Sequence, residues 1–242
     1  FCRASVVTAP IRMVKDAAEI AALRQAGAAV DRIIADLQAG LVPLVGRTEA
    51  DVASEIAQRI RTEGHYKVNF TIVDSGPNAA SPHHDPTDRV IQYGENVLFD
   101  IGGTMAGPNG VGYCSDITRC VHIGEPPAEF AELYAVLHAS HAAGVAAATV
   151  GTPCQDVDAA ARKVIADAGL GEFFIHRTGH GIGVEAHEYP NMVAGNLLPL
   201  AAGHAFSVEP GIYVPGKWGA RLEDILVATP DGPDAMNLVD HG

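Results

Sequence analysis

The stretch Val45-Gly46-Arg47-Thr48-Glu49-Ala50-Asp51-Val52 is echoed later in the chain by Val150-Gly151-Thr152-Pro153-Cys154-Gln155-Asp156-Val157. The two segments lie 105 positions apart (45 to 150), and the same spacing relates Ile60 to Ile165. A chance match is one explanation, and a duplicated structural unit is the other. A duplication predicts an α+β fold of two pseudo-symmetric halves, with a curved antiparallel sheet inside and helices outside.

Helix and strand signals support this division, because they occur in two similar rounds. Each round begins with two helical segments, and the four segments are marked by capping residues or proline at their starts and, in three cases, by glycine just beyond their ends. The predicted helices span residues 16–38, 48–62, 127–149 and 153–168. Short apolar runs bounded by turn residues predict strands at 68–73, 97–101, 113–121, 205–209 and 222–227.

Two acids accompany the strands of the first half. Asp100 ends an apolar run, Asp116 lies in the predicted strand 113–121, and the turn-rich residues 106–110 separate them. If the strands form an antiparallel hairpin centred near Pro108, Asp100 and Asp116 lie opposite each other on one face, with Cβ atoms about 5 Å apart. Carboxylates at that separation suit a pair of divalent cations about 3.5–4 Å apart.

The second half repeats the arrangement with Glu209 and Glu223, which would pair in a hairpin centred at Gly216. A single acid at a strand end is commonly a solvated or capping group, which is the alternative for each residue taken alone. Four carboxylates that converge in a partly buried site would repel one another and take up protons. Two divalent cations would neutralise them, so the set predicts a dinuclear metal centre.

A segment rich in histidine and glycine, residues 176–190, supplies the fifth ligand. His176, His180 and His187 follow one another at intervals of four and seven residues. Glycine allows the backbone to approach a ligand closely while adding nothing to a core, so a packing role explains this segment poorly. The predicted metal ligands are Asp100, Asp116, His180, Glu209 and Glu223. Oxygen and imidazole donors without thiolate favour cations such as manganese, magnesium or cobalt.

The composition excludes several classes of protein. A chain of 242 residues with 48% hydrophobic content and no apolar run near 18 residues can bury a sizeable core and has no predicted membrane span. The net charge of −13 argues against nucleic acid as a partner. The four cysteines form no CxxC pair, which favours a reducing compartment and a cytoplasmic location. They are Cys2, Cys114, Cys120 and Cys154.

The ordered ligands carry a resemblance to a known family, which three further strings strengthen. These strings are Ser81-Pro82-His83-His84, Glu209-Pro210-Gly211-Ile212-Tyr213 and Arg221-Leu222-Glu223-Asp224. The chain resembles the two-metal aminopeptidases with the pita-bread fold and, among them, the Xaa-Pro peptidases, prolidase and aminopeptidase P. The resemblance implies a metal-dependent exopeptidase that hydrolyses the bond between an N-terminal residue and proline in small peptides.

The same resemblance implies cofactors and roles at the metal centre. Two divalent metal ions are expected, with manganese favoured and cobalt, zinc or iron as alternatives. Asp100 would chelate one metal, Asp116 and Glu223 would bridge both, and His180 and Glu209 would complete the other. Glu209 would also carry the proton from the attacking water to the leaving nitrogen.

The remaining roles concern the substrate. By resemblance, His83 and His187 would donate hydrogen bonds to the substrate carbonyl and the developing oxyanion. His176 matches a pocket histidine of the Xaa-Pro branch, and Arg221 matches a cation that holds an acid in place. His65 and His84 are predicted to be surface or structural residues. The sequence leaves open whether the protein forms a homodimer.

Three alternative functions remain, and one of them, a metal-independent hydrolase that acts on a small amide, would require that ligands had been lost. A methionine aminopeptidase is favoured by the chain length, but the interval of 14 residues between Glu209 and Glu223, together with His176, favours the Xaa-Pro branch. A non-catalytic relative that binds peptides or proteins would be expected to have lost ligands, and all five are present. The interval of 16 residues from Asp100 to Asp116 is longer than is typical of prolidase-like enzymes, and an insertion at the hairpin tip accounts for it.

The domain organisation follows from the same comparison. Xaa-Pro peptidases usually carry a further N-terminal domain, and this sequence has no initiator methionine. We therefore expect residues 1–12 to be an N-terminal leader or the remnant of a missing N-terminal domain. Residues 13–242 are expected to form the metallopeptidase catalytic domain.

Overall fold

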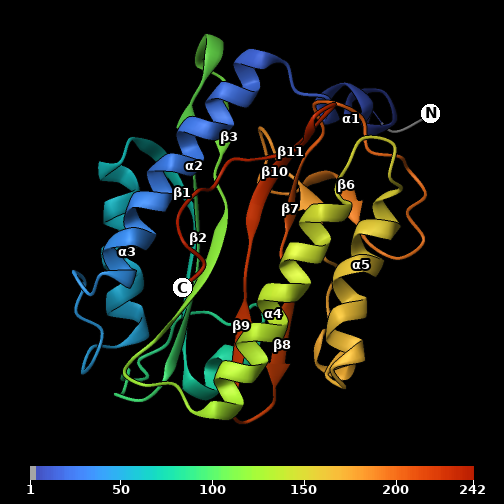
Figure 1. Cartoon of the computed structure of the whole chain (residues 1–242). Coiled ribbons are helices and arrows are strands. Elements are labelled where there is room, and N and C mark those ends of the chain that lie inside the picture. Colours follow the sequence, from blue (N-terminus) through green and yellow to red (C-terminus); the bar gives the residue numbers. More distant parts are fainter. Residues whose placement is uncertain (1–3) are drawn as a thin grey trace.

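The computed structural model describes residues 4–242, so Cys2 lies outside the described residues. A first helix, α1 (Ser5–Met13), precedes two rounds of helices and strands. The first round contains α2 (Ala17–Gln38), α3 (Glu49–Thr62), β1 (His65–Ser75), β2 (Asn96–Ala106), β3 (Gly112–Cys114) and β4 (Ile117–His122). In Figure 1, α2 and α3 lie together on one side of the strands, and the helices of the second round lie on the other.

The second round begins with two helices and ends with short strands. Its elements are α4 (Ala128–Ala147), α5 (Cys154–Asp167), β5 (Gly179–Gly181), β6 (Glu188–Met192), β7 (Ala205–Val208), β8 (Gly211–Val214), β9 (Trp218–Arg221), β10 (Asp224–Thr229) and β11 (Gly232–Ala235). Three 3₁₀ helices, η1 (Gly76–Ala80), η2 (Pro108–Gly110) and η3 (Gly171–Phe173), lie in the connections. The four long helices start and end within two residues of their predicted bounds.

Local chemistry explains why the helix bounds could be predicted. Asp16 caps α2 with a full capping box, in which its side chain accepts from the backbone N–H of Glu19 while Glu19 accepts from the N–H of Asp16. Thr48 caps α3 by accepting from the N–H of Asp51 at 3.0 Å. Gly64, just beyond α3, has a φ of +104°, a conformation that glycine adopts readily.

The repeat is a property of the structure as well as of the sequence. Helix α5 starts and ends 105 positions after α3, from 49 to 154 and from 62 to 167. The strand order also repeats, because β2 lies between β1 and β4 while β7 lies between β5 and β10. All these pairings are antiparallel, as predicted. The hydrogen-bonded ladders fall into three sheets, and an isolated bridge from Thr118 to Glu223 joins the halves.

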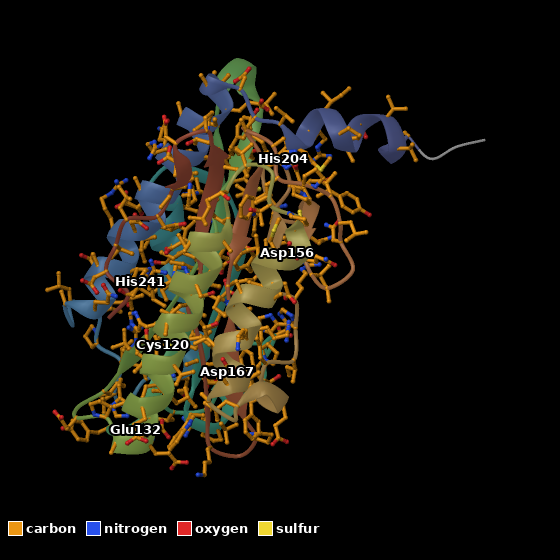
Figure 2. The ribbon with its side chains drawn as sticks, turned by 45° about the vertical axis from the view of Figure 1, so that its right-hand side comes forward. Cys120, Glu132, Asp156, Asp167, His204 and His241 are labelled. Carbon is orange, nitrogen blue, oxygen red and sulfur yellow. The ribbon has the colours of Figure 1, made fainter. Side chains whose placement is uncertain are left out.

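The core consists of apolar layers between the helix pairs and the strands. One cluster packs α2 and α3 against β1 and β2 and includes Val30, Ile56 and Phe99. A second cluster includes Leu137 and Ile165 of α4 and α5 and extends to Leu98 and Cys120 of the first half. A third cluster packs α5 against later strands. The outer faces of α4 and α5 carry exposed acids such as Glu132, Asp156 and Asp167, which contribute to the negative charge (Figure 2).

The structure also describes three of the four cysteines and the length and polarity of the helices. Cys114, Cys120 and Cys154 are buried and free. Cys114 and Cys120 belong to apolar clusters. Among residues 4–242, none of the helices combines the length and apolar character that crossing a membrane requires.

The register of the first hairpin differs from the prediction. Asp100 pairs with Thr118, and Thr104 pairs with Cys114, so the hairpin is centred at position 109 and not at Pro108. The predicted strand 113–121 is also split into β3 and β4. The Ser115 hydroxyl accepts from the N–H of Gly103, and the Ser115 carbonyl approaches Gly102 so closely that a Cβ there would lie 2.4 Å from its oxygen.

This error in register preserved the predicted face. A shift of two residues keeps the alternation of a strand, so Asp116 stays on the same side as Asp100. The second hairpin was placed correctly, because Gly211 pairs with Arg221 and Val208 pairs with Asp224, and both pairs are centred at Gly216. Glu209 and Glu223 lie between these two ladders and face each other by continuity of the register.

Candidate metal centre

The five predicted ligands come from separate elements and line one cavity of about 580 Å³. Asp100 lies on β2, His180 on β5 and Asp116 between β3 and β4, while Glu209 follows β7 and Glu223 precedes β10. The cavity lining also contains the three predicted substrate histidines. The full lining is Phe70, Ile72, His83, Asp100, Asp116, His176, Arg177, His180, His187, Glu209 and Glu223.

Three of the predicted ligands converge closely. One ligand atom each from Asp116, His180 and Glu223 lies within 4.8 Å of the other two. The Nε2 atom of His180 is 3.7 Å from Asp116 Oδ2 and 3.3 Å from Glu209 Oε1. The side chains of Asp116, His180 and Glu223 are almost fully buried, so these groups face one another with little water between them.

Backbone contacts fix the orientation of His180. Its Nδ1 atom lies 3.1 Å from the carbonyl oxygen of Gly181, which can only accept a hydrogen bond, so Nδ1 carries the proton. The Nε2 atom is left with a free lone pair that faces the carboxylates of Asp116 and Glu209. A backbone acceptor on the second nitrogen is the usual way in which a metal-binding histidine is oriented.

Ser207 ties His180 to Glu209. Its hydroxyl accepts from the His180 N–H at 3.0 Å and donates to Glu209 Oε1 at 3.0 Å. The fit depends on the glycine at position 179, since a Cβ there would lie 1.9 Å from the carbonyl oxygen of Ser207. The glycines of the segment therefore serve close packing of strand against strand.

Arg221 connects the acids of the two halves. Its guanidinium donates to Asp100 Oδ2 at 2.5 Å and to the hydroxyl of Thr118 at 3.1 Å. The Thr118 hydroxyl in turn donates to Glu223 Oε2 at 2.7 Å. Arg221 is 1% exposed, so its charge acts within the protein interior, where screening by water is weak.

A chain of hydrogen bonds extends from Arg221 to His176. The guanidinium donates to the Tyr213 hydroxyl at 2.7 Å, and that hydroxyl lies 2.9 Å from His176 Nε2. The Nδ1 atom of His176 lies 2.7 Å from the Arg177 carbonyl and must donate to it. Tyr213 therefore donates to Nε2, and every proton in the chain has a defined position.

Burial favours the uncharged forms of the acids and histidines of the site, so it raises the pKa values of the acids and lowers those of the histidines. Burial, followed by the charges of Glu223 and Asp100, raises the pKa of Asp116 well above its usual range. Burial and then Glu209 do the same to the pKa of Glu223, and burial also raises the pKa of Glu209. Burial lowers the pKa of His180 to about 4 and that of His176 to about 3, so both imidazoles are neutral at pH 7.

The residues present fit divalent cations. Their donors are carboxylate oxygens and one neutral imidazole, the set that suits manganese, cobalt, zinc or iron. Within residues 4–242 the Oδ1 atom of Asp100 is buried and has no hydrogen-bond partner, although Arg221 holds Oδ2. Cations would satisfy that oxygen and remove the repulsion that raises the pKa values of the acids.

The predicted substrate residues surround this centre. His83 and His187 are both exposed and line the cavity. The ring of His187 lies 4.1 Å from that of His180 between centroids. His65 has a structural role, because its ring bonds to the Ser115 hydroxyl and the Ile60 carbonyl. His84 lies away from the cavity lining and 3.3 Å from Asp74.

Sequence reasoning assigned no role to several residues of the site. Thr118, Ser207 and Tyr213 hold predicted ligands or pocket residues in place, and Arg177 lines the cavity. A signal existed for Thr118 and Ser207, because each lies two positions from a predicted ligand and therefore on the same strand face. Tyr213 offered no such signal, since its partners Arg221 and His176 lie outside its strand, 8 and 37 residues away.

Two related α+β halves that share a buried cluster of acids define the class of pita-bread metallohydrolases. Residues 21–230 match the model of Metallopeptidase family M24, so the chain belongs to this family of metal-dependent peptidases. The fold class expected from the sequence is thereby confirmed.

Two curated proteins and one crystal structure are similar to this chain over most of its length. The chain is 53% identical to "Probable dipeptidase PepE" of Mycobacterium tuberculosis (strain H37Rv) over 231 residues, which cover 96% of this chain and 60% of that protein. It is 44% identical to the "Xaa-Pro dipeptidase" of Lactobacillus delbrueckii subsp. lactis over 227 residues, which cover 93% of this chain and 60% of that protein. The crystal structure of dipeptidase PepE from Mycobacterium ulcerans superposes with a TM-score of 0.93 at 54% identity, covering 98% of this chain and 62% of that one. The chain thus spans about 60% of the length of the curated relatives that it matches.

Proposed function

We propose that this chain is the catalytic part of a peptidase that uses two divalent metal ions to hydrolyse the bond between an N-terminal residue and proline. The observation that carries the proposal is the convergence of four acids and the free Nε2 lone pair of His180 on one cavity. The relatives named as dipeptidase and Xaa-Pro dipeptidase support this branch of the family over methionine aminopeptidase.

The ligand roles follow from the contacts that remain free. Asp100 would chelate one cation mainly through Oδ1, because Arg221 holds Oδ2. Asp116 and Glu223 would bridge the two cations, and His180 and Glu209 would complete the second site. When bound, the cations supply positive charge that polarises the substrate carbonyl and lowers the pKa of a water molecule.

The chain's own residues would manage the protons. Glu209 would accept a proton from the attacking water and deliver it to the proline nitrogen as the C–N bond breaks and a C–O bond forms. Ser207 donates to Oε1 of Glu209 and so holds the carboxylate in one orientation. His83 and His187 would donate hydrogen bonds to the carbonyl oxygen as it gains negative charge.

The substrate pocket would lie beside His176. Phe70 and Ile72 line the cavity and would supply apolar contacts for the proline ring, and the neutral ring of His176 is held by Tyr213 and the Arg177 carbonyl. Manganese is the favoured metal on the chemistry of the donors, with cobalt, zinc and iron as alternatives. The division into residues 1–12 and 13–242 stays a prediction, as does the possibility of a homodimer.

An activity comparison tests the proposal. The purified chain, loaded with Mn²⁺ or Co²⁺, is offered Xaa-Pro dipeptides, Xaa-Pro-Yaa tripeptides and Met-Ala peptides. Hydrolysis of the proline peptides and its loss after chelation support the proposal, and the ratio of dipeptide to tripeptide cleavage separates prolidase from aminopeptidase P activity. Cleavage confined to Met-Ala peptides would overturn it.

A further inference from the structure

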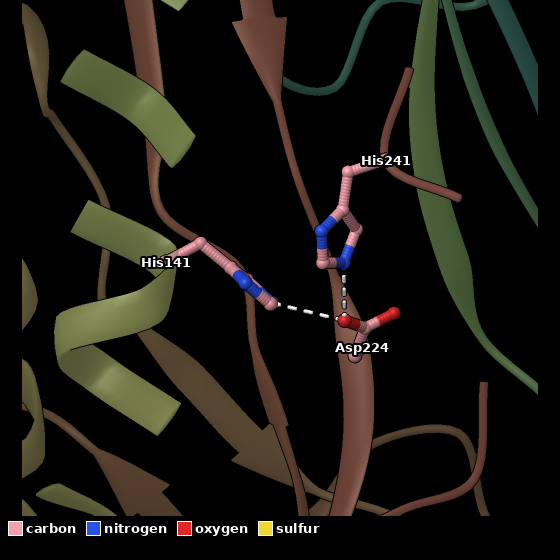
Figure 3. Close-up of side chains that lie close together, drawn as sticks. All are labelled: His141, Asp224 and His241. Carbon is pink, nitrogen blue, oxygen red and sulfur yellow. Dashed lines mark hydrogen bonds and ion pairs between the residues drawn. The ribbon is translucent and has the colours of Figure 1, made fainter. Parts of the chain in front are cut away.

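Two histidines and an aspartate form a second cluster of ligand-type side chains in the described part of the chain. His141 lies on α4, Asp224 on β10, and His241 in the segment that follows β11. In Figure 3, both imidazoles point at the same carboxylate oxygen of Asp224. One ligand atom from each residue lies within 4.8 Å of the other two.

The distances within the cluster are those of hydrogen bonds and lie close to the separation of ligand atoms in a coordination site. His241 Nε2 lies 2.8 Å and His141 Nε2 lies 3.2 Å from Asp224 Oδ2. Ligand atoms around a tetrahedral cation with bonds of about 2.0–2.1 Å lie roughly 3.3 Å apart. A small movement of the Asp224 carboxylate would therefore admit a cation between the three atoms.

One atom of the cluster lacks a satisfactory partner. His141 is 3% exposed, yet its Nε2 atom makes no hydrogen bond of acceptable geometry with any residue from 4 to 242. Buried polar atoms are normally paired, and those that are not call for an explanation. A cation between His141 Nε2 and Asp224 Oδ2 would give this nitrogen a partner through its lone pair.

The other oxygen of Asp224 is already engaged. Arg119, which is fully buried, donates to Oδ1 at 2.6 Å. This bond fixes the carboxylate and turns Oδ2 toward the two histidines. His241 is 33% exposed on its side chain, so water can reach the cluster and complete the coordination of a cation.

We propose that His141, Asp224 and His241 form a binding site for one transition-metal cation of the zinc, cobalt(II) or nickel(II) type, in addition to the predicted dinuclear centre. Two imidazoles and one carboxylate select these cations over magnesium and calcium, which prefer oxygen ligands. The proposal does not depend on the peptidase activity, because none of its three ligands lines the active-site cavity.

Counting bound metal tests the site. The chain is stripped with a chelator, dialysed against Zn²⁺ or Co²⁺, and analysed for metal per chain. His141→Gln is expected to bind one equivalent fewer than the wild type, and Co²⁺ should lose part of its visible d–d absorption. His122→Gln is the matched control, because that histidine lies outside the cluster, and it should bind as much metal as the wild type.

Two further variants keep the test decisive. His241→Gln changes a partly exposed residue and should fold even if His141→Gln does not, and it too should lose one equivalent. Asp116→Asn combined with Glu223→Gln removes predicted ligands of the dinuclear centre and should retain the equivalent held by the cluster. Equal metal content in the wild type, His141→Gln and His241→Gln would overturn the proposal and leave a hydrogen-bonded His–Asp–His group.

Discussion

The hydroxyl of Thr118 donates to Glu223 Oε2 at 2.7 Å across a separation of 105 residues. The backbones of the same two residues form the bridge that joins the sheets of the two halves, with the Glu223 N–H donating to the Thr118 carbonyl at 3.2 Å. The interface between the halves is therefore also part of the predicted metal centre. An error in their packing would displace Glu223 directly.

Replacement of Thr118 by valine tests this link. Thr118→Val keeps the shape but removes the donor to Glu223 and the acceptor for Arg221. We expect metal affinity to fall by about 10–100-fold, the usual effect of losing a partner of a metal ligand. Competition with a chelator measures it. Thr118→Ser should restore most of the affinity, whereas valine with wild-type affinity would contradict the positioning role.

Asp116→Asn and Glu223→Gln should have opposite effects on activity and on the stability of the metal-free chain. Loss of a shared ligand should lower kcat/KM by at least about 10²–10³-fold, as removal of one strong electrostatic contact does. Because burial raises the pKa of both acids, their ionisation destabilises the metal-free fold as pH rises above about 4.

The stability arm of this prediction is measured by urea unfolding with excess chelator at pH 7.5. Each variant should unfold at a higher urea concentration than the wild type, and the difference should shrink as the pH falls toward about 3, where the acids become protonated in the unfolded state as well. Glu132→Gln, at an exposed position on α4, is the control and should change little. Near wild-type turnover in either variant would refute its role as a bridging ligand.

Gly179→Ala should disturb the centre through the backbone. The new Cβ would lie 1.9 Å from the Ser207 carbonyl oxygen, and relief of that clash must move β5 away from β7. We expect a loss of about 3 kcal/mol in stability, at the upper end for overpacking, together with weaker metal binding. Gly171→Ala is the control, since its new Cβ would lie 3.3 Å from the nearest atoms, Cα and Cβ of Ala166. Equal unfolding midpoints for both variants would contradict the explanation.

Asp74, which is not one of the predicted metal ligands, should make the stability of the fold depend on pH. Its carboxylate is buried, neither oxygen has a hydrogen-bond partner among the described residues, and burial followed by the charge of Glu49 raises its pKa to about 8. A carboxyl group with a raised pKa stabilises the fold fully below about pH 4, and this contribution is lost as pH rises toward 8.

Asp74→Asn removes that dependence. We expect the variant to be more stable than the wild type by up to about 5 kcal/mol at pH 8 and to show little or no gain at pH 4. Urea midpoints at the two pH values measure the change, with Asp167→Asn on the exposed face of α5 as the control. A gain of the same size at both pH values would show that the effect is not caused by ionisation of Asp74.

The sequence predicted the four long helices to within two residues, because their limits are set by local chemistry such as the Asp16 capping box and the Gly64 stop. It also predicted which acids share a face, since a strand alternates with a period of two. The partner of Asp100 was wrong by two positions. The error concerns the stretch in which the backbone of Ser115 closely approaches that of Gly102. No local sequence pattern indicates this approach.

The choice and order of the five predicted ligands came from the sequence alone and stay a prediction, whereas the two related halves that carry them were predicted correctly. Tertiary structure decided how those ligands are held: Thr118 on Glu223, Arg221 on Asp100, and Tyr213 between Arg221 and His176. It alone assembled His141, Asp224 and His241 as well. The physical reason is range, since capping and alternation depend on neighbours within a few residues, whereas these contacts join side chains of different elements, which meet only in the folded chain.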